Sequence, residues 1–334
     1  MTEFSGMAVL VTGGTGSLGK RLVWELLQHG AMRVTVLSRD EKKQYDMGKQ
    51  CDDRRLSLVI GDVRDGARVG DVVRQGKFDA IVHAAALKHV IGCEQHPMEA
   101  VKTNVLGIEN VVRAARAYDV PRVVAISTDK ACKPVNVMGM TKALMERVAI
   151  SRGYSCVRYG NVIGSRGSVI PFFTKLLNEH APSLPITSFR MTRFLMTLGD
   201  AVDLVTRTLT DWLPATVRVH KAGAVRIVDL VGALVQRLKV PMPELEEVGF
   251  VHGEKLDEVL VAHEESPRAY ADGDDGIVIR PRAQFSTEPL PGDGSYGSAS
   301  HLLRQEQIIS ILERAEAEAV AAKCPWVDGW FTKG

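Results

Sequence analysis

Through the first half of the chain, short and almost continuously apolar segments alternate with longer segments of helical periodicity. The apolar segments are rich in β-branched residues, which is typical of parallel strands covered by helices on both faces. They occupy residues 7–11, 33–37, 56–60, 78–82 and 122–126. Apolar residues that recur every three or four positions predict helices at residues 17–29, 98–118 and 136–151. This alternation predicts an α/β fold with a doubly wound parallel sheet.

The pattern becomes less regular after a sixth predicted strand at residues 154–159. Further helices are predicted at 199–212, 225–238 and 305–322, with a short strand near 216–220. Residues 161–193 mix glycine, serine, proline and aromatic side chains, as a ligand-lining loop region would, and residues 283–300 are predicted to form an irregular surface segment. We therefore expect a first domain over residues 1–160, with core segments returning around 186–225, and a smaller C-terminal substrate-binding domain, mainly residues 161–334.

Composition limits the class of protein. The 334 residues include 42 Lys+Arg and 40 Asp+Glu, a formal net charge of +2, which argues against a nucleic-acid partner. The chain has no apolar run of the roughly 18–20 residues that span a bilayer, and its N-terminus lacks a signal-peptide pattern, so no membrane partner is expected. Five scattered cysteines without a CxxC pair predict neither a disulfide framework nor a metal site. We expect a soluble cytoplasmic protein.

A glycine-rich loop, Thr12-Gly13-Gly14-Thr15-Gly16-Ser17-Leu18-Gly19, follows the first predicted strand and opens the first helix. Glycines in this position permit a tight turn and a close approach of the backbone to a pyrophosphate, which the helix N-terminus then binds. A glycine-rich turn without a ligand is the alternative, but the strand before it and the helix after it favour a dinucleotide site in a Rossmann-type sheet. The expected contacts are Gly13, Gly16, Ser17, Leu18 and Gly19.

The end of the second strand bears on the choice of cofactor. An NAD site would place an acidic residue there, whereas this chain has Ser38, Arg39 and Lys42, which suit the 2′-phosphate of NADP. NADP is therefore the predicted cofactor, with a solvated charged turn as the alternative. Asp62 and Val63 follow the third strand, where an adenine pocket is expected, although a turn with a helix cap would have the same sequence.

Ser127-Thr128-Asp129-Lys130 ends the fifth strand, at the edge of the sheet where ligands bind. In short-chain dehydrogenases/reductases a tyrosine four residues before a lysine accepts the alcohol proton. Lys142 matches that lysine, but the tyrosine position is Met138, whose thioether cannot transfer a proton.

Several long stretches closely resemble the extended short-chain dehydrogenases/reductases that act as UDP-N-acetylglucosamine 4,6-dehydratases, in the branch that includes the C5-inverting enzymes. They are the glycine loop and residues 38–41, 83–90, 127–131, 157–168, 190–194 and 253–256. The resemblance runs from about residue 9 to residue 264. It implies oxidation at sugar C4, elimination across C5 and C6, and return of the hydride to C6.

The resemblance also implies roles for the segment after the fifth strand. Lys130 would remove the C5 proton, Asp129 would assist departure of the C6 oxygen, and Thr128 would bind the C4 oxygen. A strand-end salt bridge is the alternative for Asp129 and Lys130. Met138 leaves the acceptor of the C4 proton open between Asp129 and a water held by Thr128 and Lys142.

The remaining expected contacts come from the later motifs. Ala84 and Ala85 would contact the cofactor, and a metal role for the nearby histidines is not expected because ligands at suitable spacing are missing. The expected nucleotide-sugar contacts are Lys88, Asn161, Arg166, Ser168, Arg193 and Glu254.

The resemblance implies a homo-oligomer, either a dimer or a hexamer, with residues 1–160 binding NADP and residues 161–334 mainly binding the UDP-sugar. Two alternatives are an epimerase or dehydratase acting on another nucleotide sugar, and a non-catalytic NADP-binding regulator.

Overall fold

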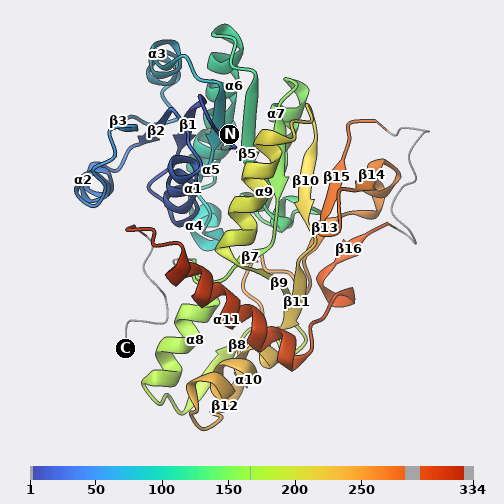
Figure 1. The fold of residues 1–334 in the computed structure, drawn as a ribbon. Helices are drawn as coiled ribbons and strands as arrows, with labels where there is room; N and C mark the ends of the chain where they lie inside the picture. Colours follow the sequence, from blue (N-terminus) through green and yellow to red (C-terminus); the bar gives the residue numbers. More distant parts are fainter. Residues whose placement is uncertain (1–2, 166, 283–293, 327–334) are drawn as a thin grey trace.

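A nine-stranded sheet forms the centre of the computed structural model, which describes residues 3–165, 167–282 and 294–326 (Figure 1). The strand order is β3-β2-β1-β4-β5-β6-β10-β15-β14, and every neighbouring pair from β3 to β10 is parallel. β15 and β14 extend it with antiparallel pairs. The bounds are β1 Ala8–Thr12, β2 Arg33–Ser38, β3 Leu56–Ile60, β4 Ala80–His83, β5 Arg122–Ile126, β6 Ser155–Arg158, β10 Val217–His220, β14 Ala269–Ala271 and β15 Gly276–Ile279. The predicted α/β fold class is confirmed.

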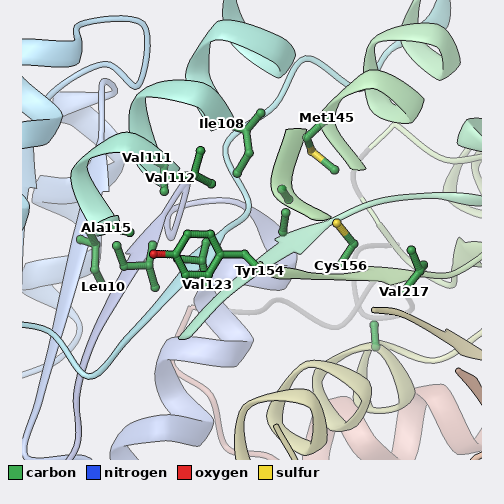
Figure 2. Close-up of a cluster of buried hydrophobic side chains, with 14 of the residues drawn as sticks. Leu10, Ile108, Val111, Val112, Ala115, Val123, Met145, Tyr154, Cys156 and Val217 are labelled. Atoms are coloured by element: carbon green, nitrogen blue, oxygen red, sulfur yellow. The ribbon is translucent and has the colours of Figure 1, made fainter. Parts of the chain in front are cut away.

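Helices cover both faces of this sheet because each carries one apolar face. Buried residues of α1 and α9, such as Leu22 and Val205, pack on one face. Those of α3, α6 and α7, such as Val69, Ile108 and Met145, pack on the other, and part of this cluster is shown in Figure 2. The bounds are α1 Ser17–Gln28, α2 Glu41–Lys49, α3 Gly66–Gly76, α4 Val90–Gln95, α5 Pro97–Ala100, α6 Gly107–Ala117, α7 Val137–Ser151 and α9 Leu198–Thr210.

A smaller region packs beside the carboxyl ends of the central strands (Figure 1). It contains three small sheets, β11-β9-β7, β12-β8 and β13-β16. The first two contribute to a third apolar cluster, whereas Leu260 and Val261 of β13 pack in the cluster of the large sheet. The strand bounds are β7 Asn161–Val162, β8 Ser183–Ile186, β9 Thr192–Met196, β11 Gly223–Arg226, β12 Glu244–Glu247, β13 Val259–Val261 and β16 Tyr296–Gly297. The helices are α8 Val169–Asn178, α10 Ile227–Leu238 and α11 Gln305–Ala321.

Two sequence expectations differ from the structure. Residues 161–193 are not a loop region, because they contain α8, β8 and β9. The predicted irregular segment at 283–300 lies outside the described residues up to 293, and its remainder includes β16 and a short 3-10 turn at Ser298–Ser300. The domain division at residue 160 stays a prediction. The large sheet also includes β10, β14 and β15, which come from later in the chain.

The predicted helix at 98–118 is interrupted by a π-helical turn at Val101–Leu106, between α5 and α6. The turn carries Asn104, a buried amide that accepts a hydrogen bond from Leu87 N at 2.8 Å and donates to Leu87 O at 3.0 Å. Its Nδ2 also donates to Thr141 Oγ1 on α7 at 3.0 Å. The irregular turn therefore fixes the loop after β4 against α7, as π-helical turns often do at functional sites.

A buried ion network joins the large sheet to the later part of the chain. Arg158, at the end of β6, holds Glu146 of α7 with two bonds of 3.0 and 2.6 Å. The same guanidinium holds Glu265 with two bonds of 2.8 and 3.1 Å. Ser127 Oγ donates to Glu146 at 2.5 Å. Burial raises the pKa of Glu265, but Arg158 outweighs burial and holds this pKa below its usual value.

None of the helices within the described ranges is both long and apolar enough to cross a lipid bilayer.

Candidate active site

The glycine loop between β1 and α1 packs directly on the backbone at the end of β4. Gly13 has a φ of 70°, and a Cβ there would lie 2.7 Å from both N and Cα of Ala85. A Cβ on Gly19 would lie 2.6 Å from the Cα of Gly14. Only glycine fits these two positions, so the loop holds the predicted Ala84-Ala85 segment at the start of α1.

Gly16 differs, because a Cβ there would meet only Gly13 O, at 3.4 Å. It is the N-cap of α1, no side chain caps the helix, and its first turn contains no acidic residue. The helix begins with the predicted residues Ser17 and Leu18. A helix N-terminus with an open, uncharged approach is suited to an anion, so this loop fits the pyrophosphate of a dinucleotide.

Two alanine substitutions separate packing from anion binding. Gly13→Ala is expected to destabilise the protein by about 1–3 kcal/mol from its left-handed backbone alone, and more through the contact with Ala85. Gly16→Ala is expected to change the free energy of unfolding by less than about 0.5 kcal/mol, because its backbone suits any residue. Its methyl group would nevertheless weaken cofactor binding. Thermal denaturation and calorimetry measure the two effects, and unchanged cofactor affinity in Gly16→Ala would contradict the anion site.

The side chains at the end of β2 are arranged around a second turn. Ser38 is buried, with its Oγ 2.9 Å from Thr15 Oγ1. Asp40 caps α2 by accepting a bond from Lys43 N at 3.0 Å, and its carboxylate also pairs with Lys43 Nζ at 2.6 Å. Asp40 is therefore occupied by the helix it starts, and the next acidic residue, Glu41, lies in the first turn of that helix. Arg39, with 57% of its side chain exposed, faces outward.

Neighbouring residues complete this part of the site. Asp62 lies 3.7 Å from Arg39 and pairs with Arg64 at 2.6 Å. Lys42 is exposed and pairs with Asp46 at 2.8 Å. Val63 is buried beside the same turn. The turn and helix cap expected as an alternative are present as well, since the next helix, α3, is capped by Asp65.

Three predicted catalytic residues gather in one turn after β5. Thr128 Oγ1 donates to Asp129 Oδ1 at 2.7 Å, and Lys130 Nζ donates to the same oxygen at 3.0 Å. Asn161, from β7, lies with its Oδ1 3.4 Å from Lys130 Nζ. Asp129 is completely buried, and within the described ranges its Oδ2 has no hydrogen-bond partner. Oδ2 is therefore the Asp129 oxygen whose hydrogen-bonding capacity is unused among the described residues.

Sequence reasoning assigned no role to two residues of this cluster, Lys255 and Glu258. Glu258 lies 3.4 Å from Lys130 Nζ and 3.2 Å from Lys255 Nζ. Burial lowers the pKa of Lys130, but Asp129 and Glu258 outweigh burial and the cation of Arg193, so this pKa lies above its usual value. Lys130 is therefore an ammonium ion at neutral pH in this arrangement. The one available signal was the 253–256 motif, because Glu258 comes just after it.

Lys142 and Met138 lie on α7, next to the end of β5. Lys142 Nζ donates to Ile126 O at 2.6 Å, and burial lowers the pKa of Lys142 to about 8. Met138 is buried in an apolar cluster with Cys93 and Ala100. Its side chain therefore packs between α7 and the helices before it.

His83, at the end of β4, is fully buried. Burial, with the nearby cation of Lys142, lowers the pKa of His83 to about 3, so the imidazole is neutral. Its Nδ1 lies 2.9 Å from Thr12 Oγ1 at the end of β1. The described ranges contain no cluster of three or more side chains that could hold a metal ion.

The predicted sugar-nucleotide contacts lie around the same edge. Arg193 of β9 donates to Leu256 O at 3.1 Å and to Lys255 O at 2.9 Å, and so ties the 255–258 segment to the small sheet. Ser168 is the N-cap of α8, and among the described residues its buried Oγ has no partner. Glu254 Oε2 accepts a bond from Val251 N at 3.3 Å.

The last two predicted contacts are Lys88 and Arg166. Lys88 is exposed in the loop after β4. The following residue, His89, lies against the start of α8, because a Cβ on Gly167 would be 3.1 Å from His89 Cε1. Arg166 lies outside the described residues.

Comparisons with known proteins agree with this fold. The sequence profile of the family described as "Polysaccharide biosynthesis protein" matches residues 9–278. The chain is 37% identical over 292 residues to a Campylobacter jejuni UDP-N-acetylglucosamine 4,6-dehydratase (inverting), covering 84% of this chain and 85% of that protein. It is 41% identical over 324 residues to a Rickettsia bellii protein named UDP-glucose 4-epimerase, covering 93% and 90%.

Two solved structures show the same fold. The X-ray structure of Pen from Bacillus thuringiensis has a TM-score of 0.85 at 32% identity and covers 93% of this chain and 98% of that one. A dTDP-glucose 4,6-dehydratase from Streptomyces venezuelae, solved with NAD and TYD bound, has a TM-score of 0.67 at 24% identity and covers 74% and 86%. The chain therefore belongs to the polysaccharide biosynthesis protein family of extended short-chain dehydrogenases/reductases, which has members named as nucleotide-sugar dehydratases and as nucleotide-sugar epimerases.

Proposed function

We propose that the protein is an NADP-dependent UDP-N-acetylglucosamine 4,6-dehydratase. The observation that carries this proposal is the pairing of buried Asp129 with partly buried Lys130 at the ligand edge of the sheet, with their charged atoms 3.0 Å apart. A 4-epimerase removes and returns hydrogen at C4 alone. A 4,6-dehydratase must in addition move protons at C5 and at the C6 oxygen, which requires an acid and a base side by side.

The proposed reaction conserves atoms and electrons. A nicotinamide cofactor, held by the glycine loop and the N-terminus of α1, would supply the redox chemistry that moves a hydride from C4 to C6. Lys130 takes the C5 proton while the C6–O bond breaks. Asp129 protonates the departing oxygen, which leaves as water. Lys130 then returns a proton to C5. The product is a 4-keto-6-deoxy sugar, and no net oxidant or reductant is consumed.

The C4 hydroxyl proton requires its own acceptor, because Met138 is buried in an apolar cluster. Asp129 is the favoured candidate, either directly or through Thr128, whose hydroxyl already donates to it. A proton that Asp129 takes from the C4 oxygen is the proton it later needs at the C6 oxygen. A water held by Thr128 and Lys142 is the second candidate, although Lys142 Nζ is bonded to Ile126 O.

The charge balance of the pair fits this sequence of steps. Lys130 is an ammonium ion in the resting arrangement, whereas a base must be neutral. Lys130 must therefore lose its proton to solvent before turnover, and the Asp129 carboxylate then takes the C4 hydroxyl proton, which leaves a neutral base beside a neutral acid. The elimination then regenerates the ion pair.

The second candidate function is epimerisation at C4, favoured by the 41% identity to the Rickettsia bellii protein. One incubation separates the two functions. The protein is mixed with UDP-N-acetylglucosamine and NADP in deuterated water, without added reductant, and the products are read by NMR at C5 and C6.

We expect a C6 methyl group and deuterium at C5. An epimer that keeps its C6 hydroxymethyl group and its C5 hydrogen would establish the epimerase instead. UDP-glucose serves as the comparison substrate. Binding without turnover of either sugar would exclude both enzymes and favour a regulator.

The choice of NADP is tested at Arg39. Its exposed guanidinium lies beside the β2 turn, while Asp40 is occupied as a helix cap. We expect Arg39→Ala to weaken NADP binding by about tenfold or more, since a bond to a charged group contributes about 1.5–3 kcal/mol. NAD binding should change little because it lacks the 2′-phosphate. Calorimetry with both cofactors measures this, and equal losses would remove Arg39 from the 2′-phosphate site.

The UDP-sugar partner and the dimer or hexamer are parts of the same proposal. Light scattering of the purified protein tests the assembly.

A further inference from the structure

We propose that Glu258 is a positioning residue that, held by Lys255, fixes the amino group of Lys130 between two carboxylates. The inference rests on the proposed role of Lys130 as the base at C5. It assigns to the 255–258 segment a part in catalysis that does not require contact with the sugar.

Glu258 reaches Lys130 from a segment that is distant in sequence. Its side chain is 3% exposed, with Oε1 3.4 Å from Lys130 Nζ and Oε2 3.2 Å from Lys255 Nζ. Lys255 Nζ also donates to Cys132 O at 2.9 Å, in the turn that follows Lys130. The two lysines and the carboxylate therefore form a bridge from the β5 turn to the later segment.

The backbone of Glu258 is held as firmly as its side chain. Its N–H donates to Ser298 Oγ at 2.9 Å, and its carbonyl accepts from Ser298 N at 2.8 Å. Ser298 Oγ lies 2.5 Å from Thr192 Oγ1, which donates to Asp257 Oδ1 at 2.6 Å. Segments from β9 and from the turn at Ser298–Ser300 thus fix the backbone that carries the Glu258 side chain.

The charged groups that face Lys130 come from three elements. Asp129 lies on its own turn, Glu258 on the later segment and Arg193 on β9, while Asn161 of β7 adds a neutral amide oxygen. With Asp129 alone, the flexible Lys130 side chain could follow that carboxylate to many positions. A second fixed carboxylate confines its amino group to the region between the two, and small displacements of a catalytic group can lower rates about 100-fold.

The charge of Glu258 and its position have separable consequences. Removing the charge in Glu258→Gln lowers the pKa of Lys130, so the neutral base is present at lower pH. The ascending limb of the kcat/KM profile should therefore move down by about one pH unit or more. Lys255→Met removes the cation that shares Glu258 with Lys130. The ascending limb should therefore move to higher pH. Glu258→Asp keeps the charge but places it farther from Lys130, because the side chain is one methylene group shorter. This variant should have a lower kcat, and its ascending limb should move less than that of Glu258→Gln.

The first measurement needs no substrate. The Cε signal of Lys130 is followed by NMR in lysine-labelled protein with NADP bound, and is assigned by its loss in Lys130→Arg. We expect its titration to shift down in Glu258→Gln and up in Lys255→Met. The control is Glu264→Gln, which breaks the exposed pair of Lys133 and Glu264, 3.5 Å apart, and should leave the titration unchanged.

The second measurement is the pH profile of product formation for the same variants, whose folding is checked by thermal denaturation. A large fall in kcat with little change in KM, together with shifted limbs, supports positioning. Equal rate losses at every pH with an unmoved Lys130 titration would overturn it. If the titration shifts but neither the wild-type protein nor any variant converts a UDP-sugar, the proposed function fails while the electrostatic coupling stands.

Discussion

Replacement of Lys130 by alanine should lower the rate of 4-keto-6-deoxy product formation by about 10²–10⁴-fold, the range of a lost general base. The amino group is the one base that the turn after β5 places beside Asp129. Without it the C5 proton has no acceptor at that position. Incorporation of solvent deuterium at C5 should fall in parallel, and NMR of the same reaction measures both.

The control for this variant is Lys175→Ala on α8, whose side chain is 71% exposed and pairs with Glu179 at 3.8 Å. It should keep wild-type turnover. Lys130→Ala leaves Asp129 and Glu258 without their shared cation, so cofactor affinity and melting temperature must be compared before the rate is interpreted. Normal product formation by a folded Lys130→Ala protein would remove Lys130 from the mechanism.

The largest effect on stability is expected for Arg158→Met. Arg158 is the cation between the buried carboxylates of Glu146 and Glu265. Its removal leaves both carboxylates without their principal partner, and breaking a buried pair in this way costs about 3–5 kcal/mol. Chemical denaturation at neutral pH measures the loss.

The pH dependence of this loss has a definite sign. In the wild-type protein, Arg158 holds the pKa of Glu265 below its usual value, so the contribution to stability is present at neutral pH and is lost as the pH falls through that value. In Arg158→Met, burial disfavours the ionised form of Glu265, so protonation of this carboxyl group removes the cost of its unpaired charge. The difference between the two proteins should therefore shrink towards about pH 4, near the ordinary pKa of glutamate.

Arg226→Met is the matched control for Arg158→Met. Arg226 holds Asp229 with two bonds of 2.7 and 2.9 Å, but the arginine side chain is 51% exposed. The same substitution should cost less than about 1 kcal/mol there. Equal losses for the two variants would show that burial of the Arg158 network does not determine its contribution.

The central strands could be predicted because burial on both faces leaves a simple apolar pattern. The segments expected at residues 33–37 and 122–126 correspond to β2 and β5 within one residue. Residues 56–60 correspond to β3, an edge strand that is only partly buried but keeps the apolar pattern. α2 was missed because its buried positions are few and include the polar Gln44. α8 was missed because its Pro171 and adjacent phenylalanines resemble a loop, although Ile170, Phe173 and Leu177 form a buried helical face.

The candidate site was predictable only where its residues are close in sequence. Thr128, Asp129 and Lys130 share one turn, and a sheet edge could be assigned to them from the strand before. Glu258 could not be predicted to join them, since its spacing of three from Lys255 is also that of an ordinary surface pair on a helix. The tertiary structure, through Ser298 and the small sheet, turns that pair inward.

The strand order of the large sheet has a consequence for synthesis of the protein. β6 pairs on one side with β5 and on the other with β10, which follows about 60 residues later. During translation the first six strands can assemble, but the outer edge of β6 stays open until residues 217–220 emerge. An unpaired edge strand of apolar sequence can form hydrogen bonds with a strand of another chain. A polypeptide truncated soon after residue 160 should therefore aggregate rather than fold as an independent dinucleotide-binding domain.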